Sequence, residues 1–190
     1  MYGLVNRAVQ GLVETAWGDA AWAAICADAG VDPAGFLAME SYPDEITYRL
    51  VAAASKHSGW SAEEILRAFG EYWVLYTGRE GYGALMTATG SNLEEFLTNL
   101  DNLHSRVSTT FTELSPPSFR TEVVASDTLR LHYYSHRPGL TPLVVGLLEG
   151  LGQMFETRVA VTVERSRADG AAHDTFLVRH GRDLRREVDA

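Results

Sequence analysis

The sequence predicts an α+β protein in which an amino-terminal helical lobe is followed by a carboxy-terminal lobe of antiparallel sheet with helices. From the start of the chain to about Phe111, apolar residues recur at three- and four-residue intervals, the period of a helix. At Ser115-Pro116-Pro117 two successive prolines end any helix. Beyond them the chain alternates between apolar and polar residues, the period of a half-buried strand. We expect residues 1–114 to be helical, residues 115–180 to combine helix and sheet, and residues 181–190 to be a charged tail.

The first three helices are marked by apolar spacing and by residues that begin or end helices. Asp19 is placed to cap the second helix, which Gly30 ends, and Tyr42-Pro43-Asp44 opens a third that runs toward Gly59. The first helix carries an apolar stripe of Leu4, Val5, Val9, Leu12 and Val13.

The second half contains three segments with strand character and one apolar helix. Thr128 to Ser135 alternates, and so do the valines of 159–163. Asp169-Gly170 supplies a turn before the apolar run of 176–178. Between the first two strands, Thr141-Pro142 begins an apolar helix, with a capping residue followed by proline at the first helical position.

Composition excludes several classes of protein. Of the 190 residues 46% are apolar and 22% charged, which is ordinary for a folded globular chain. The net charge of −9 repels nucleic-acid phosphates and anionic membrane surfaces, so neither is an expected partner. Cys26 is the only cysteine, which excludes an intrachain disulfide and a cysteine-bound cluster. No secretion signal and no apolar run of about 20 residues are present, so a cytoplasmic location is expected.

One histidine lies on an apolar stripe. Two capping boxes, Ser61 with Glu64 and Ser91 with Glu94, predict helix starts, and the second opens the helix of interest. Four-three spacing along that helix aligns Leu93, Leu97, Leu100, His104, Val107 and Phe111. His104 is therefore expected to point into an apolar interior. Taken alone, this spacing favours a core histidine with a hydrogen-bond partner over a metal ligand.

A polar row follows in the sheet region. Tyr133, Ser135 and Arg137 are spaced by two, so a continuous strand would aim all three the same way over about 13 Å. Two hydroxyl donors and a guanidinium suit paired carboxylates or a phosphate. A structural tyrosine beside an exposed arginine explains the same spacing, and the spacing does not decide between the two.

Other catalytic patterns are absent or weak. Gly81-Tyr82-Gly83 lacks the third glycine of a dinucleotide-binding loop, and the chain has neither a Gly-Lys-Ser/Thr loop nor a Gly-x-Ser-x-Gly elbow. His132 and His136 would stand about 13 Å apart on a strand, too far to share a metal. We interpret them as surface histidines.

Several segments together resemble one family. The segments that carry the likeness are Met1-Tyr2-Gly3-Leu4-Val5-Asn6, Val51-Ala52-Ala53-Ala54-Ser55, Phe69-Gly70, Glu80-Gly81-Tyr82, Leu100-Asp101-Asn102-Leu103-His104, Pro117-Ser118-Phe119 and Tyr133-x-Ser135-x-Arg137. In order and spacing they resemble the H-NOX family of haem nitric oxide/oxygen binding domains, whose animal member is the regulatory domain of the soluble guanylate cyclase β subunit. The likeness runs from Met1 to about His180.

This resemblance implies a single domain of residues 1–180 with haem b between the two lobes. His104 matches the proximal iron ligand of the family. Tyr133, Ser135 and Arg137 match its propionate-binding motif, and Pro117 matches the proline that presses on the macrocycle and distorts it. These roles agree with a histidine on an apolar stripe and a polar row facing an otherwise apolar ligand.

The resemblance also bears on which gas is bound. Oxygen-binding members carry a tyrosine donor at the position that Leu143 matches here, and Val5, Val74 and Leu143 would line an apolar distal pocket. Bound oxygen needs such a donor, whereas nitric oxide and carbon monoxide do not. Trp73 could donate through its indole N–H, but packing at the pocket wall is the simpler role. The expected function is sensing of nitric oxide, with carbon monoxide also bound and oxygen excluded.

The expected protein is a sensor and not an enzyme. The chain leaves no room for an output domain, so a separate signalling protein is expected, which in bacterial relatives is usually a histidine kinase or a diguanylate cyclase. Nitric oxide would weaken or break the iron–His104 bond and bias a two-state equilibrium that the partner reads. The alternative is a haem-free module for an apolar ligand or a protein partner, with His104 as a core residue.

Overall fold

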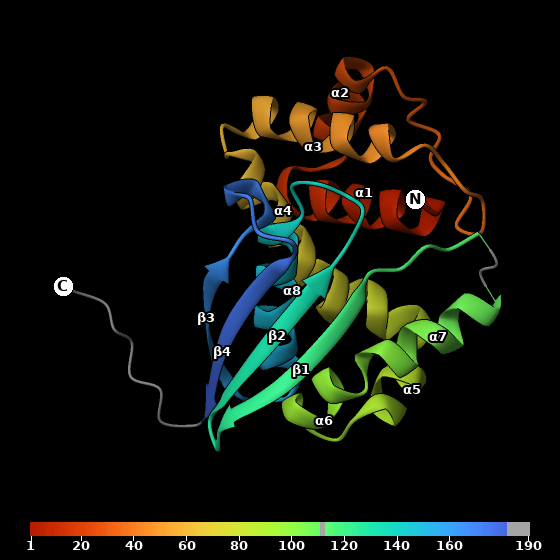
Figure 1. Ribbon diagram of the computed structural model, residues 1–190. Helices are drawn as coiled ribbons and strands as arrows, with labels where there is room; N and C mark the ends of the chain where they lie inside the picture. The colour runs from red at the N-terminus through yellow and green to blue at the C-terminus, as the bar shows by residue number, and fades with distance from the viewer. Residues whose placement is uncertain (111–112, 182–190) are drawn as a thin grey trace.

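The computed structural model describes residues 1–110 and 113–181, without the side chains of residues 77–81 and 110. Phe111 of the predicted stripe and residues 182–190 of the predicted tail lie outside the described residues. Helices make up the amino-terminal region, and an antiparallel sheet lies at the carboxy-terminal end (Figure 1), which confirms the predicted α+β class. The elements, in chain order, are α1 (Gly3–Trp17), α2 (Asp19–Ala29), α3 (Asp44–Ser58), α4 (Ala62–Tyr72), the π-helix η1 (Trp73–Thr77), α5 (Gly78–Thr89), α6 (Leu93–Thr98), α7 (Leu100–Thr110), β1 (Ser118–Ala125), β2 (Thr128–Tyr134), α8 (Thr141–Met154), β3 (Arg158–Arg165), the 3-10 helix η2 (Arg167–Asp169) and β4 (Asp174–Gly181).

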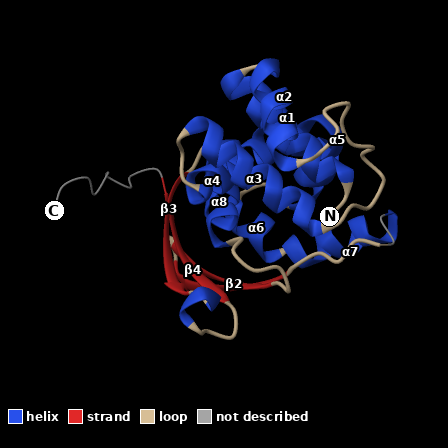
Figure 2. Cartoon of the chain, turned by 90° about the horizontal axis from the view of Figure 1, so that it is seen from above, coloured by secondary structure: helices blue, strands red, loops and turns tan. Residues whose placement is uncertain are grey.

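The described strands form one antiparallel sheet in the order β1-β2-β4-β3. In the register of its two central strands, Tyr133 pairs with Asp174 and Leu131 pairs with Phe176. Seen from above, the α-helices lie against one side of the curved sheet, and the short η2 lies on its other side (Figure 2). Leu131 and Phe176 are fully buried on that side, so alternation along the strands places the apolar residues against the helices.

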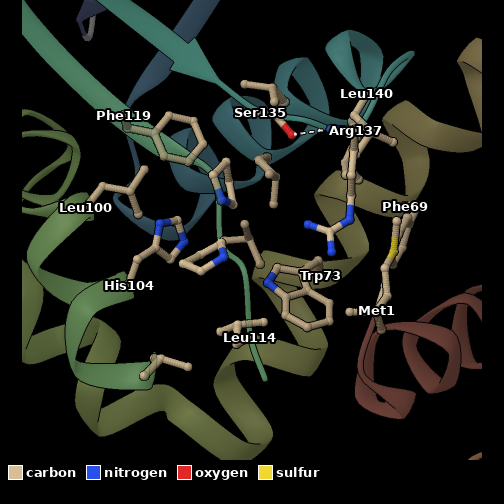
Figure 3. A pocket seen from close by; sticks show the side chains of 18 of the residues that line it. Met1, Phe69, Trp73, Leu100, His104, Leu114, Phe119, Ser135, Arg137 and Leu140 are labelled. Carbon is tan, nitrogen blue, oxygen red and sulfur yellow. Dashed lines mark hydrogen bonds between the residues drawn. The ribbon is translucent and has the colours of Figure 1, made fainter. Parts of the chain in front are cut away.

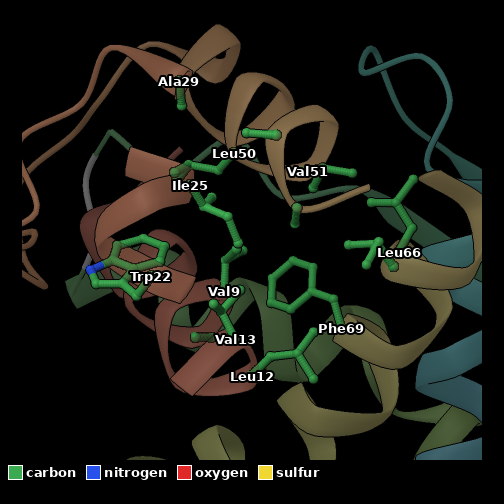
Figure 4. Close-up of a cluster of buried hydrophobic side chains, with 14 of the residues drawn as sticks. Val9, Leu12, Val13, Trp22, Ile25, Ala29, Leu50, Val51, Leu66 and Phe69 are labelled. Atoms are coloured by element: carbon green, nitrogen blue, oxygen red, sulfur yellow. The ribbon is translucent and has the colours of Figure 1, made fainter. Parts of the chain in front are cut away.

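The core consists of two clusters of buried apolar side chains. The first is built by α1 to α4 and includes Val9, Ile25, Leu50 and Phe69 (Figure 4). The second is built by the inner face of the sheet, α6 and much of α8. Trp73 packs against both clusters, so the boundary between the cores falls near the start of η1 rather than at the start of the sheet.

Helices α4 and α8 join the two halves by direct backbone contact. A Cβ atom at Gly70 would overlap the carbonyl oxygen of Leu143, and one at Gly146 would overlap the carbonyl oxygen of Arg67. Only glycine permits an approach this close. Beside this contact, Arg67 donates from Nε to Glu149 Oε2 at 2.6 Å, and its Nη2 donates to the other carboxylate oxygen.

The early helix boundaries are close to those expected. The capping box of Ser61 and Glu64 is confirmed, because the Glu64 amide donates to Ser61 Oγ at 3.2 Å and the Ser61 amide donates to Glu64 Oε2 at 2.7 Å. Gly30 ends α2 in the left-handed conformation, with φ of +63°. The prediction for Asp19 is wrong by one residue, since Gly18 is the N-cap and Asp19 is the first helical residue.

The second predicted capping box is also displaced by one residue. Asn92 is the N-cap and accepts a hydrogen bond from the Glu95 amide at 2.9 Å, while Ser91 donates its own amide to Glu95 Oε2 at 2.8 Å. Glu94 is therefore not the partner of Ser91. The single helix predicted from here to about residue 111 is two helices, α6 and α7, because the helix is interrupted at Asn99. The Asn99 side chain donates to a carbonyl of α5.

In the second half, the predicted strands correspond to β2, β3 and β4, but β1 was not predicted. It is an edge strand whose adjacent Val123 and Val124 are both exposed, and two neighbouring apolar residues interrupt the alternation. Helix α8 begins at Thr141, one residue before Pro142, the predicted first helical position. Its N-cap, however, is Leu140, and the Thr141 hydroxyl serves another residue instead of capping the helix.

Candidate functional site

A cavity of about 340 Å³ lies between the two cores, with walls from α1, α3 to α8, η1, β1 and β2. This volume is within the range of small-molecule and cofactor sites. All nine site residues that the sequence singled out line it (several are shown in Figure 3): Val5, Trp73, Val74, His104, Pro117, Tyr133, Ser135, Arg137 and Leu143. Residues from seven separate segments thus meet in one place, as the family pattern predicts.

His104 points into this cavity from α7 (Figure 3). Its ring lies against Phe119 with 5.6 Å between centroids, and its Nδ1 atom is buried without a hydrogen-bond partner. Burial lowers the pKa of His104, although the charge of Asp101 and a backbone contact with Pro117 act in the opposite direction. The imidazole is therefore neutral at pH 7, the form in which histidine binds metals.

Asp101 ties the helix of His104 to the first strand. Its Oδ1 accepts a hydrogen bond from the Phe119 amide at 2.6 Å, and its Oδ2 accepts one from the Ser118 hydroxyl at 2.9 Å. Pro117 precedes these two residues. The proline segment and the helix of His104 are consequently held together by one carboxylate.

The polar row is assembled differently from the prediction. Strand β2 ends at Tyr134, so Ser135 and Arg137 lie in the loop that follows and strand geometry does not align them with Tyr133. All three still line the cavity, because the loop folds back: the Arg137 amide donates to Ser135 Oγ at 3.1 Å. Burial raises the pKa of Tyr133, with a hydrogen bond to Ser135 opposing it.

Arg137 connects the cavity to the amino-terminal lobe. Its Nε donates to Asp44 Oδ2 at 2.7 Å, and its Nη1 donates to the Ser115 carbonyl at 2.9 Å. The amino-terminal ammonium of Met1 donates to the other oxygen of Asp44 at 2.6 Å. Burial opposes ionisation of Asp44, but the hydrogen bonds from these two cations hold its pKa below the ordinary value.

The wall near Trp73 is mostly hydrocarbon. Val5, Val74 and Leu143 line it, and Val74 is 3% exposed. Trp73 points into the cavity and packs edge-on against Phe69, with 6.3 Å between ring centroids (Figure 3). Trp73 and Val74 open the π-helix, an irregularity often found at functional sites that the spacing of the sequence did not reveal.

A buried polar pair behind this wall was also missed. Thr47 lines the cavity and donates its hydroxyl hydrogen to Asn6 Oδ1 at 2.6 Å. Both side chains are buried. Asn6 belongs to the opening segment that carries the resemblance, but nothing in the spacing indicates a contact between residues 41 positions apart. His132 was likewise misjudged as a surface histidine: its side chain is 17% exposed and its Nδ1 lies 2.9 Å from His173 Nε2.

The donor set of the cavity fits a haem. A neutral imidazole with a free nitrogen suits the iron, hydrocarbon walls suit the macrocycle, and hydroxyl and guanidinium groups suit its carboxylates. Comparison with known proteins supports this fit, since residues 2–163 match the protein family described as Haem-NO-binding. The chain belongs to the Haem-NO-binding family. Members of this family bind haem and are gas-sensor domains, not catalytic ones.

Curated relatives of this Haem-NO-binding chain are guanylate cyclases. It is 39% identical to the soluble guanylate cyclase subunit beta-2 of Rattus norvegicus over 122 residues, which are 61% of this chain and 18% of that protein. It is 32% identical to the soluble guanylate cyclase gcy-35 of Caenorhabditis elegans over 188 residues, 95% of this chain and 26% of that protein. The chain therefore spans about a quarter or less of the length of these relatives.

Solved structures share the fold. An H-NOX protein from S. oneidensis in the Fe(II)NO state aligns with a TM-score of 0.85 at 18% identity, covering 95% of this chain and 99% of the other. The oxygen complex of an oxygen-binding H-NOX domain related to soluble guanylate cyclases aligns with a TM-score of 0.78 at 23% identity, covering 95% and 94%. These two solved structures hold different gases in the same fold. In the described ranges no helix has both the length and the apolar character that crossing a bilayer requires.

Proposed function

We propose that this domain senses nitric oxide at ferrous haem, that it also binds carbon monoxide but does not retain oxygen, and that it signals to a separate partner protein. The observation that carries the selectivity is the hydrocarbon side chain of Leu143 in the cavity wall, at the position where the family's oxygen binders carry a hydroxyl donor. When bound, the haem supplies an iron centre with one coordination position open to a diatomic gas.

His104 is the proposed iron ligand. Its buried Nδ1 has no partner and its pKa is lowered by burial, so no proton competes for the ring at pH 7. The carboxylate of Asp101 holds the neighbouring proline segment in place. Pro117, which lines the cavity there, is the residue proposed to press on the macrocycle.

Tyr133, Ser135 and Arg137 are proposed to bind the propionates. Arg137 offers a planar donor fork in a cavity whose walls are otherwise largely apolar, and charge-assisted bonds of this kind are strong. Arg137 already contacts Asp44, and through it the amino terminus. Movement of Arg137 would therefore reach the first turn of α3 and the start of α1 through Asp44, and this is the region proposed to communicate with a partner.

Gas selectivity is proposed to follow from the chemistry of the distal wall. Val5, Val74 and Leu143 present only hydrocarbon, so they provide no hydrogen bond to a partly anionic oxygen. Trp73 carries the competing donor, its indole N–H. Its edge-on packing against Phe69 is consistent with a role in the wall.

The test is an absorption spectrum of the reduced protein taken without gas and then with nitric oxide, carbon monoxide and air. We expect a Soret band that shifts with the first two gases and no stable oxygenated form in air. A stable oxygenated spectrum would contradict the proposed selectivity. Protein that takes up no haem would instead support the haem-free module. For the partner, a histidine kinase or a diguanylate cyclase is the proposed class, and its activity should change with nitric oxide only when this domain is added.

A further inference from the structure

The loop that carries Arg137 needs an explanation for its shape. Strand β2 ends at Tyr134, and α8 does not begin until Thr141, so the ladder of the sheet holds neither Ser135 nor Arg137. A loop of this length is ordinarily mobile unless side chains fix its ends. Figure 1 shows the end of β2, the start of β4 and the start of α8 at the same end of the molecule.

One buried carboxylate lies where these segments meet. Asp174, the first residue of β4, is 4% exposed. Its Oδ2 accepts a hydrogen bond from the Thr141 hydroxyl at 2.9 Å, and its Oδ1 accepts one from the Arg167 amide at 2.6 Å. The guanidinium of Arg167 in turn donates through Nη1 to the carbonyl of Ser135. The carboxylate therefore reaches both ends of the loop, Thr141 directly and Ser135 through Arg167.

We propose that Asp174 is the positioning residue that presents Ser135 and Arg137 to the haem propionates. This inference rests on the proposed haem site but not on the choice of gas. Asp174 pairs with Tyr133 across the two central strands, so it also lies beside the first residue of the propionate motif in the sheet. It does not line the cavity itself and acts through the residues that do.

The physical argument is that a buried carboxylate is stable only when both oxygens are satisfied. Here each oxygen has a donor, and the donors come from two different segments, η2 and α8. Moving either segment would leave one oxygen of a buried carboxylate without its donor, which is costly. The same bond to Thr141 fixes the first turn of α8, two residues before Leu143. One residue would thus set both the propionate edge and one wall of the gas pocket.

The chain offers a matched set of variants. Asp174→Ala removes both hydrogen bonds. Asp174→Asn keeps the shape and can still accept from the Arg167 amide and donate to the Thr141 hydroxyl, so it removes only the charge. Thr141→Val removes a single bond, and Thr141→Ser restores the hydroxyl. Asp169→Asn, an exposed carboxylate in η2, is the control for a lost charge nearby.

The first measurement is hydrogen exchange in the apoprotein, which needs neither haem nor gas. The Arg137 amide, bonded to Ser135 Oγ, reports the loop. In Asp174→Ala and Thr141→Val this amide should exchange at least about fivefold faster than in the unaltered chain, because a buried hydrogen bond has been lost. Asp174→Asn, Thr141→Ser and Asp169→Asn should stay within about twofold. If Asp174→Ala does not fold, Thr141→Val still tests the proposal.

The second measurement is the rate of haem transfer to an excess of a haem-scavenging apoprotein, with the propionate bending bands followed by resonance Raman spectroscopy. Asp174→Ala and Thr141→Val should lose haem at least about fivefold faster and shift these bands. Unchanged bands and unchanged transfer, despite faster exchange in the loop, would overturn the proposal and leave Asp174 a purely structural residue. Unchanged loop exchange would also overturn it. A failure of gas selectivity in the unaltered protein would affect neither result.

Discussion

Arg137 donates from Nε to Asp44 Oδ2 at 2.7 Å, although the two residues are 93 positions apart in the sequence. The bond joins the loop after β2 to the first turn of α3. Asp44 also receives the amino-terminal ammonium, so three segments from different regions of the chain share one carboxylate. The residue proposed to hold a haem propionate is thereby linked to the first turn of α3 and to the start of the chain.

Changing Arg137 should weaken haem binding. Arg137→Ala would leave a propionate without its bidentate partner, and losing a charge-assisted pair of this kind costs on the order of 2–5 kcal/mol. Haem transfer to a scavenging apoprotein should be markedly faster. Arg137→Lys keeps the charge but not the planar fork, so its rate of haem transfer should lie between those of the unaltered protein and Arg137→Ala. Equal transfer rates in all three proteins would mean that Arg137 does not hold a propionate.

Removing the proposed iron ligand should remove the colour. His104→Gly is expected to be purified without haem and to regain a Soret band when imidazole is supplied, because the free ligand can occupy the space that the side chain leaves. His104→Leu fills that space with hydrocarbon and should not respond to imidazole. Haem content equal to that of the unaltered protein in His104→Gly, without imidazole, would disprove the assignment.

A hydroxyl in the cavity wall should allow oxygen to be held. Leu143→Tyr places a donor at the family's oxygen-stabilising position, and a hydrogen bond to a charged acceptor is worth roughly 1.5–3 kcal/mol, about ten- to hundredfold in affinity. Leu143→Phe carries the same ring without the hydroxyl and serves as the control. Oxygen affinity and oxidation rate in air separate the two. An equal gain in both variants would show that pocket shape, and not the donor, governs the choice of gas.

The ion pairs of Asp44 predict how stability depends on pH. Burial opposes its ionisation, yet hydrogen bonds from the amino terminus and Arg137 hold its pKa below that of an exposed aspartate, about 3.9. Below that value the unfolded chain binds the proton more readily than the folded one. The contribution of the Asp44 ion pairs to the free energy of unfolding is therefore complete above about pH 4 and is lost as the pH falls through the folded pKa. Chemical denaturation should show Asp44→Asn less stable than the unaltered apoprotein at pH 6, with the difference shrinking under acid conditions. Asp169→Asn should show no such convergence.

Periodicity located most of the fold because it is a local property. The helices of the first half and strand β2 carry their buried faces in their own spacing, as Leu131 illustrates. Strand β4 was predicted instead from an apolar run that follows a turn. Strand β1 lacked that signal because it lies at the edge of the sheet with Val123 and Val124 exposed. The displaced cap at Asn92 shows a second limit, since neighbouring residues with similar side chains compete for one position.

The site was predictable only to a degree. Spacing placed His104 on an apolar stripe but could not tell a ligand from a core residue, and only the family resemblance favours the ligand. A continuous strand was predicted to align Tyr133, Ser135 and Arg137, and this was wrong because β2 ends at Tyr134. The roles of Asp44 and Asp174 could not be found, because Arg137 lies 93 positions from Asp44, Thr141 lies 33 positions from Asp174, and no local pattern marks either contact.

The contact between α4 and α8 fixes the width of the cavity beside it. At Gly70 and Gly146 the two helices meet backbone to backbone, and a Cβ at Gly150 would lie 3.0 Å from Cβ of Val74. Val74 and Leu143 thus lie on segments whose separation is fixed by direct backbone contact. Rotamer changes elsewhere in the core do not alter this separation, because no side chain lies between the two backbones at the contact. Substitutions can therefore accumulate in both hydrophobic clusters while the width of the cavity beside this contact is preserved.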